Sequence, residues 1–292
     1  MDLMFRLSFF NKNQSEYIVI GFNYLGKMGQ LGNQMFQYAS LRGIARNRGY
    51  QFCIPYHHEV SVDTLGNNIK IELFNAFEMP NVTQDNIKFI DPSRPIIKES
   101  GHGFDENIFN TCEDDVCLVG YFQTEQYFKQ IENEIRQDFT FKNGILAACK
   151  EFIKQYEKPI ALHIRRGDYL IKPENHTNLG FDYYAKALAK FDANRPVIIF
   201  SDDPEWCKQQ DIFKNNRFVL LVGNSNYVDL CLMSLCTDFI IANSSFSWWG
   251  AWLSTNIDKK VYSPNPSKWF GSNLSHLDTS DLLPVDWEII NF

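Results

Sequence analysis

Hydrophobic residues in the second half of the chain form short continuous runs, and amphipathic stretches separate these runs. Each run predicts a buried strand: residues 159–164, 196–200, 217–222 and 238–242. Apolar residues at helical spacing predict helices between them, at residues 181–192, from 204 towards 213, at 227–236 and from 248 to 254. Asp203 suits the cap of the second of these helices, with Pro204 in its first turn. This alternation indicates a parallel sheet that is covered on both faces.

The first half opens with a similar unit. Residues 17–22 predict a short buried strand, residues 26–32 a glycine-rich turn, and residues 33–48 a helix that Gly49 can cap. A strand, a glycine turn and a helix in this order are typical of the start of a nucleotide-binding α/β domain. Residues 51–150 have α/β character, with a strand within residues 114–121, but their pattern does not give a strand order.

The whole pattern predicts an α/β protein of two domains. A chain of 292 residues has the length of about two ordinary domains. We place the break between residues 150 and 158, which gives an N-terminal domain of residues 1–155 and a C-terminal domain of residues 156–292.

Composition narrows the class of protein. With 45% hydrophobic residues the chain can bury a sizeable core, and its net charge of −7 argues against nucleic acid as a main partner. The seven cysteines include no C-x-x-C pair, so we expect reduced, buried thiols and neither a disulfide framework nor a zinc site. The chain has no run of the ~18 to 20 apolar residues that a membrane span needs, and residues 1–10 lack the pattern of a signal peptide. These features predict a cytoplasmic protein.

Polar clusters follow three of the predicted strands of the second half. They are His163-Ile-Arg165-Arg166-Gly-Asp168, Ser201-Asp202-Asp203 and Asn243-Ser244-Ser245-Phe246-Ser247. A fourth cluster, which contains Gly29, Gly32, Asn33 and Gln34, follows the first strand of the other half. Because ligands of open parallel sheets bind beyond the carboxyl ends of the strands, we expect the four clusters to converge on one site between the domains.

Arg165 and Arg166 are the candidates for binding a phosphate. Arginine presents a planar fork of donors that pairs with two phosphate oxygens at once, and Asp168 can hold such a fork in place. The alternative is a solvated strand end whose arginines and aspartate simply pair with one another. The pattern R-R-G-D alone does not decide between the two.

The other clusters also carry alternatives. Asp202 and Asp203 could bind a metal, cap a helix, or accept hydrogen bonds from a guanine edge or ribose hydroxyls; the chain has no D-x-D triplet, which argues against a divalent cation. The glycine turn lets backbone amides approach an anion but could equally be an ordinary strand-to-helix turn. The serine-rich stretch suits phosphate or sugar hydroxyls, whereas at least one tryptophan of the following helix is expected to anchor the core.

The ordered set of motifs resembles the alpha-1,2-fucosyltransferases of glycosyltransferase family 11. The motifs span residues 29 to 253 and are Gly29-Gln-Leu-Gly-Asn-Gln-Met-Phe-Gln-Tyr-Ala39, His163-Ile-Arg-Arg-Gly-Asp-Tyr169, Phe200-Ser-Asp-Asp203 and Asn243-Ser-Ser-Phe-Ser-Trp-Trp-Gly-Ala-Trp-Leu253. Residues 51–150 and the tail after Ser254 match no pattern that we can name. The lack of a membrane anchor makes the chain similar to the soluble bacterial type.

The resemblance implies a GT-B fold, in which two Rossmann-like domains face each other across a cleft. It implies an inverting transferase that needs no metal or other cofactor and binds its donor, GDP-fucose, largely through the C-terminal domain, with the acceptor on the N-terminal side. Arg165 and Arg166 would bind the diphosphate and Asn33 would lie beside the reacting centre. The glycine turn and residues 201–203 and 243–247 would hold the donor.

The resemblance also implies transfer to the 2-hydroxyl of a terminal beta-galactose on a glycan acceptor. Asp168 and His163 are candidates for the base that takes the hydroxyl proton, although Asp168 could only orient an arginine. One alternative is a GDP-fucose-dependent transferase of another linkage, alpha-1,6 or O-linked; the other is a non-catalytic glycan-binding protein of the same fold. Nucleic acid is not an expected partner, and peripheral association with a membrane stays open.

Overall fold

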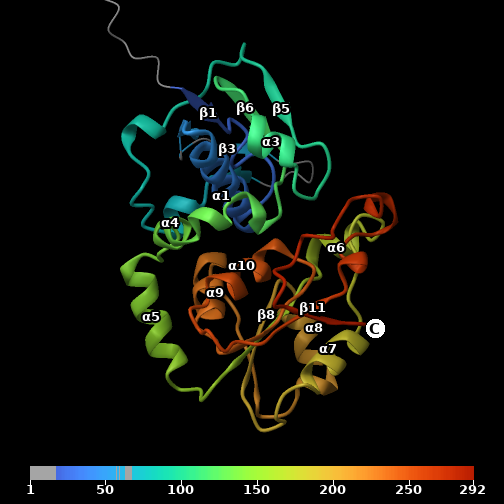
Figure 1. Ribbon diagram of the computed structural model, residues 1–292. Helices are drawn as coiled ribbons and strands as arrows, with labels where there is room; N and C mark the ends of the chain where they lie inside the picture. Colours follow the sequence, from blue (N-terminus) through green and yellow to red (C-terminus); the bar gives the residue numbers. More distant parts are fainter. Residues whose placement is uncertain (1–17, 57, 59, 63–67) are drawn as a thin grey trace, which may run out of the picture.

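The computed structural model describes residues 18–56, 58, 60–62 and 68–292. Within these residues the chain forms two α/β units, one above the other in Figure 1. The strand that we predicted from residue 17 begins at Val19; residue 17, and residues 1–10 with their missing signal pattern, lie outside the described residues.

The first unit contains a four-stranded sheet in the order β2-β1-β6-β5, and every pairing in it is parallel. Its strands are β1 (Val19–Gly21), β2 (Gln51–Cys53), β5 (Ile96–Lys98) and β6 (Val116–Val119). A separate antiparallel hairpin consists of β3 (Val60–Val62) and β4 (Asn68–Lys70). The strand predicted within residues 114–121 is confirmed as β6, whereas β2 and β5 were not predicted.

The central helix of the first unit is α1 (Leu31–Arg48), which begins two residues earlier than predicted. Gly49 ends it in the left-handed region, at φ 72°, and donates its N–H to the carbonyls of Ala45 and Arg46, so the predicted cap is confirmed. Nearly all of α1 is buried because it packs on β1 on one side and on the second unit on the other. The shorter helices are α2 (Leu73–Ala76), α3 (Glu106–Thr111) and α4 (Glu132–Asp138).

The second unit contains a six-stranded parallel sheet in the order β12-β11-β10-β7-β8-β9. Its strands are β7 (Ile160–Ile164), β8 (Val197–Ser201), β9 (Phe218–Leu220), β10 (Asp238–Ile240), β11 (Val261–Pro264) and β12 (Glu288–Ile290). Its helices are α6 (Gly167–Ile171), α7 (Phe181–Leu188), α8 (Pro204–Gln209), α9 (Asn226–Ser234) and α10 (Ser245–Leu253). The four predicted strands and four predicted helices are confirmed with shifted ends; α6 was not predicted.

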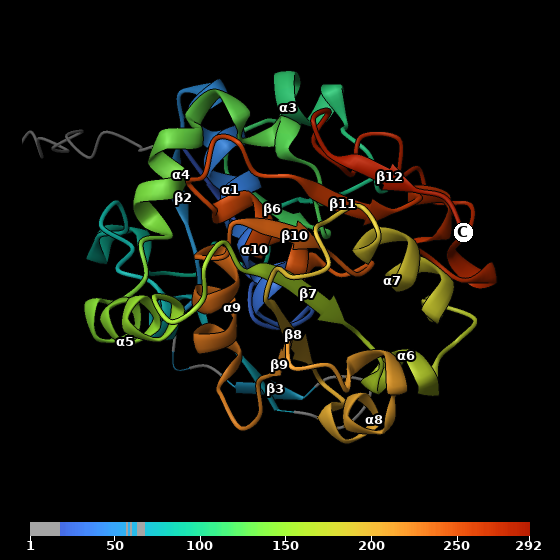
Figure 2. The same cartoon turned by 90° about the horizontal axis from the view of Figure 1, so that it is seen from below.

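Both faces of this sheet are covered, as the continuous apolar runs predicted. Along β7, Ala161 packs with the core under α9 and α10, while Ile160 and Leu162 pack with Tyr183 and Ala187 of α7. Successive side chains of a strand point to opposite faces, so a buried strand needs apolar residues at every position. Figure 2 shows α7 and α9 on either side of the strands.

The two units meet where α1 packs against α10. Trp248 and Trp249 of α10 are fully buried, and their ring centroids lie 4.6 and 4.9 Å from that of Phe36 in α1. The expectation that a tryptophan of the motif anchors the core is confirmed. Helix α5 (Asn143–Ile153) joins the units and packs on α9 (Figure 1). The division between residues 155 and 156 stays a prediction.

All seven cysteines are free and buried, in agreement with the expected reduced thiols. They are distributed over both units and α5. Among the residues that the structure describes, no helix combines the length and the apolar character that crossing a membrane requires.

Candidate active site at the facing strand ends

The polar motifs of the second unit lie at one edge of its sheet. Strands β7 and β8 are parallel and paired through Ile164 and Ser201, so the residues that follow them emerge side by side. Strand β10 lies next to β7 on the other side, and the chain turns into α10 at its end. The order of the strands therefore reverses between β7 and β10, which is the place where open α/β sheets bind ligands.

Arg165 is held by two carboxylates. Its Nη2 donates to Oδ1 of Asp168 at 2.5 Å, and its Nη1 lies 3.0 Å from Oδ2 of Asp202. The guanidinium also lies over the ring of Tyr169, 5.4 Å from its centroid. Three neighbours thus fix the plane of the guanidinium, and helix α6 brings Asp168 and Tyr169 to it.

Arg166 is held by the chain after β8. Its Nε donates to Oδ2 of Asp203 at 3.0 Å, and its backbone N–H donates to Oδ1 of Asp202 at 2.8 Å. The guanidinium carbon lies 3.8 Å from the ring centroid of Trp206, within the range of a cation–π interaction. Asp203 also accepts from the N–H of Trp206, which confirms the predicted helix cap.

The arginines and aspartates pair with each other, as the alternative interpretation of the motif proposed, yet donors remain for a ligand. A guanidinium has five N–H donors; these pairs use two of Arg165 and one of Arg166. The formal charge of the two arginines and of Asp168, Asp202 and Asp203 is not positive in sum. The cluster can therefore attract a phosphate only through donors of fixed direction, and the carboxylates supply that direction.

His163 is buried beneath the arginines, with 5% of its surface exposed. Its Nδ1 has no hydrogen-bond partner, and its ring centroid lies 5.5 Å from that of Phe246. Burial, and in second place the charge of Arg165, lower the pKa of His163 from 6.5 to about 3. The imidazole is therefore neutral at physiological pH and a weak base there.

The polar side chains from the end of β10 to the first turn of α10 mostly form hydrogen bonds with the protein main chain. Asn243 is buried and donates to the carbonyls of Thr177 and Trp269, at 2.9 and 2.8 Å. Ser247 is buried on the backbone of Ala242, and Ser244 caps α10 by accepting from the N–H of Phe246 at 3.3 Å. In this structure the side chains of Asn243 and Ser247 bind the protein main chain, and their predicted contact with a donor stays a prediction.

The glycine turn of the first unit meets the serine stretch of the second. Asn33 accepts, through Oδ1, from the hydroxyl of Ser245 at 2.7 Å and from Nε2 of Gln123 at 2.8 Å. A Cβ on Gly32 would lie 2.7 Å from the backbone nitrogen of Phe246, so only glycine permits this approach of α1 to α10. The predicted convergence of these two motifs is observed.

Gln34 supports the turn from inside. Its side chain is fully buried; Nε2 donates to the carbonyls of Gly29 and Lys70, at 3.3 and 2.9 Å, and Oε1 accepts from the N–H of Glu72 at 2.8 Å. Gly29 has φ +92°, which favours glycine. The amide of Gln34 is engaged within the protein, and the expectation that Gln34 contacts a donor stays a prediction, as for Asn243.

The prediction missed two residues of the site, Gln123 and Trp206. Gln123 follows the strand within residues 114–121, so the rule that ligands lie beyond the carboxyl ends of strands could have found it. No sequence signal joins Trp206 to Arg166, because their contact depends on how α8 packs beside β8.

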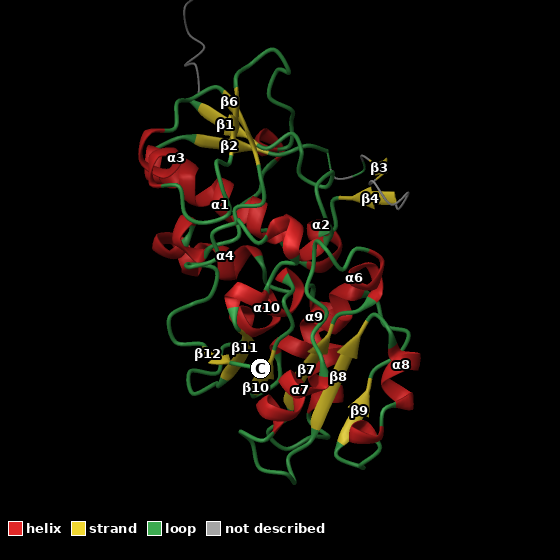
Figure 3. Cartoon of the chain, turned by 90° about the vertical axis from the view of Figure 1, so that its right-hand side faces the viewer, coloured by secondary structure: helices red, strands yellow, loops and turns green. Residues whose placement is uncertain are grey.

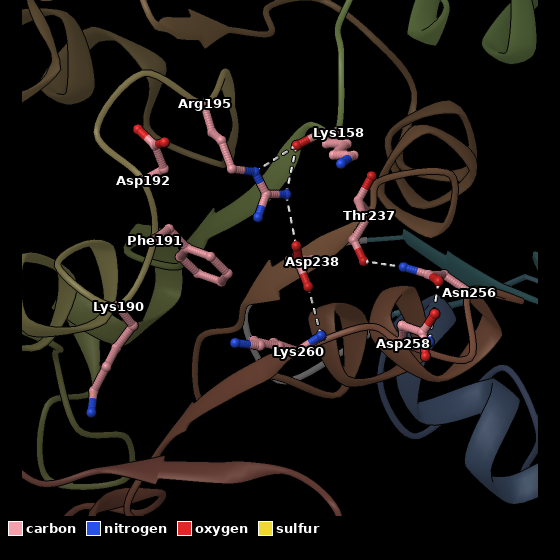
Figure 4. A pocket seen from close by; sticks show the side chains of 10 residues that line it. All are labelled: Lys158, Lys190, Phe191, Asp192, Arg195, Thr237, Asp238, Asn256, Asp258 and Lys260. Atoms are coloured by element: carbon pink, nitrogen blue, oxygen red, sulfur yellow. Dashed lines mark hydrogen bonds and ion pairs between the residues drawn. The ribbon is translucent and has the colours of Figure 1, made fainter.

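The site has no evident place for a metal ion within the described part of the chain: no group of three or more His, Cys, Asp or Glu side chains there could hold one. A hollow of about 480 Å³ lies elsewhere, at the amino ends of the strands (Figure 4). Lys158, Arg195 and Lys260 line it, and Arg195 pairs with Asp238 at 2.7 Å. Because these residues precede β7, β8 and β11, the hollow is at the opposite end of the sheet from the motifs.

Comparison with known sequences agrees with the motifs. Residues 4–277 match the profile described as "Glycosyl transferase family 11". The "O-antigen biosynthesis glycosyltransferase WbnK" of Escherichia coli is 31% identical over 287 residues, covering 84% of this chain and 94% of that protein. The "Alpha-1,2-colitosyltransferase" of Escherichia coli is 32% identical over 282 residues, covering 89% and 95%. The pig "Galactoside alpha-(1,2)-fucosyltransferase 2" is 24% identical, covering 79% and 69%.

Comparison with solved structures concerns the fold. The NodZ alpha-1,6-fucosyltransferase soaked with GDP-fucose superposes with a TM-score of 0.54 at 13% identity, covering 87% of this chain and 97% of that one. POFUT1 in complex with GDP superposes with a TM-score of 0.53 at 12% identity, covering 81% and 94%. Together with the two parallel sheets, these similarities confirm the predicted GT-B architecture.

Proposed function

The chain belongs to glycosyltransferase family 11, and we propose that it transfers L-fucose from GDP-fucose, with inversion, to the 2-hydroxyl of a terminal beta-galactose. The observation that carries this proposal is the arginine pair at the end of β7, which three aspartates hold in place. The pair lies at the same end of the sheet as the turn where Asn33 contacts Ser245. Galactoside alpha-(1,2)-fucosyltransferases among the relatives support the linkage.

The chemistry requires charge stabilisation on the donor side. The acceptor hydroxyl releases its proton to solvent as its oxygen bonds to the anomeric carbon of fucose, the bond from that carbon to the diphosphate oxygen breaks, and GDP leaves with the electron pair. Negative charge grows on the diphosphate as this happens, and the remaining N–H groups of Arg165 and Arg166 are in place to meet it. Inversion follows because the acceptor attacks the face opposite the leaving group.

The two base candidates have different environments. His163, with a pKa of about 3, is a weak base at neutral pH, so we do not assign it the hydroxyl proton. Asp168 accepts a hydrogen bond from Arg165, which makes it a positioning residue for the guanidinium. Within this proposal, Ser201, Asp202 and Asp203 together with Ser245 and Phe246 border the nucleotide, and Gly29 and Gly32 let the turn approach it.

A second donor calls for a direct comparison, because one relative at 32% identity is named as a colitosyltransferase. Colitose is fucose without the 3-hydroxyl. A site that makes a buried hydrogen bond to that hydroxyl discriminates against colitose by about 10⁴-fold, whereas an apolar pocket discriminates far less. The ratio of kcat/KM for the two GDP-sugars therefore identifies the donor.

The test combines donor and linkage. The protein is incubated with GDP-fucose or GDP-colitose and a panel of beta-galactose-terminated glycans, and the product bond is assigned by NMR. We expect fucose on the 2-hydroxyl of galactose, and tighter binding of GDP than of UDP in calorimetry. Fucose on N-acetylglucosamine, or equal binding of GDP and UDP, contradicts the proposal. Glycan binding without any transfer would support the non-catalytic alternative.

A further inference from the structure

Exposed aromatic side chains gather at the carboxyl edge of the first sheet. Tyr24 follows β1, Tyr56 follows β2 and Tyr121 follows β6. Phe89 lies two residues after Ile87, which pairs in parallel with Ile54 at the end of β2. The exposed fractions of the four aromatic residues are 36%, 43%, 40% and 36%, which is high for rings of this size. Large exposed rings on neighbouring loops indicate a surface that binds a ligand.

Contacts within the protein hold Tyr56, Phe89 and Lys27 of this group. The ring centroids of Tyr56 and Phe89 lie 5.9 Å apart, and Nζ of Lys27 lies 5.6 Å from the centroid of Phe89. Asn23 donates to the carbonyl of Ile90 at 2.8 Å and accepts from its N–H at 3.0 Å, so the chain beside Phe89 is fixed to the end of β1. The rings are therefore held before any ligand arrives, which lowers the entropy cost of binding.

The same turn connects these rings to the candidate active site. Lys27 and Asn33 belong to the stretch between β1 and the first turn of α1, and Asn33 reaches Ser245 of the second unit. Tyr121 is two residues from Gln123, which also binds Asn33. In Figure 3 the hairpin β3–β4, which follows Tyr56 in the sequence, projects on the side of the molecule where α6 and α8 lie.

We propose that Tyr56 and Phe89, with Lys27, form an acceptor subsite that binds the sugar rings beyond the accepting galactose. The proposal rests on the transferase function proposed above and deepens it. A neutral sugar ring offers a C–H face that packs on an aromatic ring and hydroxyl groups that accept from an ammonium. Aromatic side chains with few rotatable bonds provide such contact at low entropy cost. The guanine of a donor can also stack on aromatic rings, so the test below includes the Kd of GDP.

The decisive experiment compares a short and a long acceptor. Tyr56→Ala and Phe89→Ala are assayed with methyl beta-galactoside and with a beta-galactose-terminated tetrasaccharide, at saturating donor. We expect KM for the tetrasaccharide to rise about 5- to 10-fold, as for the loss of about 1 kcal/mol or slightly more. We expect kcat, KM for methyl beta-galactoside and the Kd of GDP to stay within about twofold of the parent values. Tyr56→Phe, which keeps the ring, should restore the tetrasaccharide KM.

The matched control is Ile257→Ala, which removes a side chain that is 93% exposed on the second unit and should change neither KM. If an alanine variant melts abnormally, Tyr56→Leu and Phe89→Leu replace it. The subsite is overturned if the parent shows no preference for the tetrasaccharide, if both alanine variants keep its KM within about twofold, or if KM rises equally for both acceptors.

Failure of the transferase function itself is distinguishable. If the parent protein transfers no sugar, saturation-transfer NMR with the free tetrasaccharide still reports whether it binds. Signal in the parent and in Tyr56→Phe, lost in Tyr56→Ala and Phe89→Ala, supports the subsite without the reaction; equal signal in all four proteins overturns it.

Discussion

The carboxyl ends of the two sheets present different kinds of side chain. At the end of β7 and β8, charged side chains hold one another: Arg165 between Asp168 and Asp202, and Arg166 on Asp203. At the ends of β1, β2 and β6 the side chains that face solvent are mostly aromatic rings. One edge thus provides directed N–H donors and the other provides flat apolar faces.

The difference follows the chemistry that each edge is proposed to serve. A nucleotide diphosphate carries negative charge that grows during bond breakage, so its binding surface needs cations whose position is fixed beforehand. A glycan acceptor is neutral, and rings with amphipathic neighbours bind it with little charge. If this division is right, a variant at one edge should affect one substrate and leave the other unchanged.

The largest expected effect comes from the arginine pair. Arg165→Ala or Arg166→Ala should lower turnover by about 100- to 1,000-fold for at least one of the two, because a donor to the developing charge is lost. The corresponding Lys variants keep the charge but lose the fork, so they should retain some GDP binding while turnover falls. Turnover, the Kd of GDP and the melting temperature are measured for all four variants. Normal melting with turnover within about twofold of the parent in all four would show that the pair is a surface feature.

The contact between the units offers the next test. Gly32→Ala places a Cβ 2.7 Å from the backbone nitrogen of Phe246, so α1 and α10 must separate. We expect a loss of about 1–3 kcal/mol in the free energy of unfolding, as for overpacking elsewhere, together with lower turnover. Gly144→Ala is the control: nothing lies within 4 Å of its Cβ, and alanine in the first turn of α5 should not lower the free energy of unfolding. Parent-like stability and turnover of Gly32→Ala would contradict the close approach.

The buried imidazole predicts a dependence of stability on pH. The pKa of His163 is about 3 in the folded protein, against an ordinary value of 6.5 for an exposed histidine, so the unfolded chain binds the extra proton between these values. The parent should therefore lose stability relative to His163→Asn as the pH falls from 6.5 towards 3. The slope is up to about 1.4 kcal/mol per pH unit for one proton. Denaturant unfolding at several pH values measures it; identical slopes in the two proteins would show that His163 is not buried as described.

The smallest expected effect concerns divalent cations. We predict that turnover in excess EDTA stays within about twofold of its value with magnesium or manganese, because the proposed site meets the diphosphate with the fixed N–H donors of Arg165 and Arg166. Assays after exhaustive chelation test this. Activity that disappears with EDTA and returns with either cation would assign part of the donor edge to a metal and weaken the contrast between the two edges.

The sequence predicts the second unit better than the first, for a physical reason. Strands β7, β8 and β10 are apolar at all positions but one each, His163, Ser201 and Asp238, because helices cover both faces of the sheet. Their apolar runs are therefore conspicuous in the sequence. Strands β2 and β5 have three residues each and expose Gln51 and Ile96, which leaves no clear run. Helix α6 was missed because Gly167 and Asp168 are typical of a loop.

The sequence predicts where the site lies better than it predicts the partners of each side chain. Strand ends place the motifs together, and the spacing of Arg165, Asp168 and Asp202 allows their pairing. A polar residue type does not reveal which way its side chain turns: Gln34, Asn243 and Ser247 have the chemistry of ligand contacts, yet all three bind the backbone around them. The contact of Trp206 with Arg166 depends on tertiary packing, which periodicity does not encode.

The buried thiols can report where the protein unfolds first. Each unit contains three cysteines and α5 contains Cys149, all of them free and shielded from solvent. Burial raises the pKa of Cys53 and of Cys112 to about 11, so the reactive thiolate is scarce while the protein is folded. A thiol-alkylating reagent should therefore label these positions only as their surroundings unfold. The order in which the seven sites become labelled in rising denaturant would tell which unit opens first.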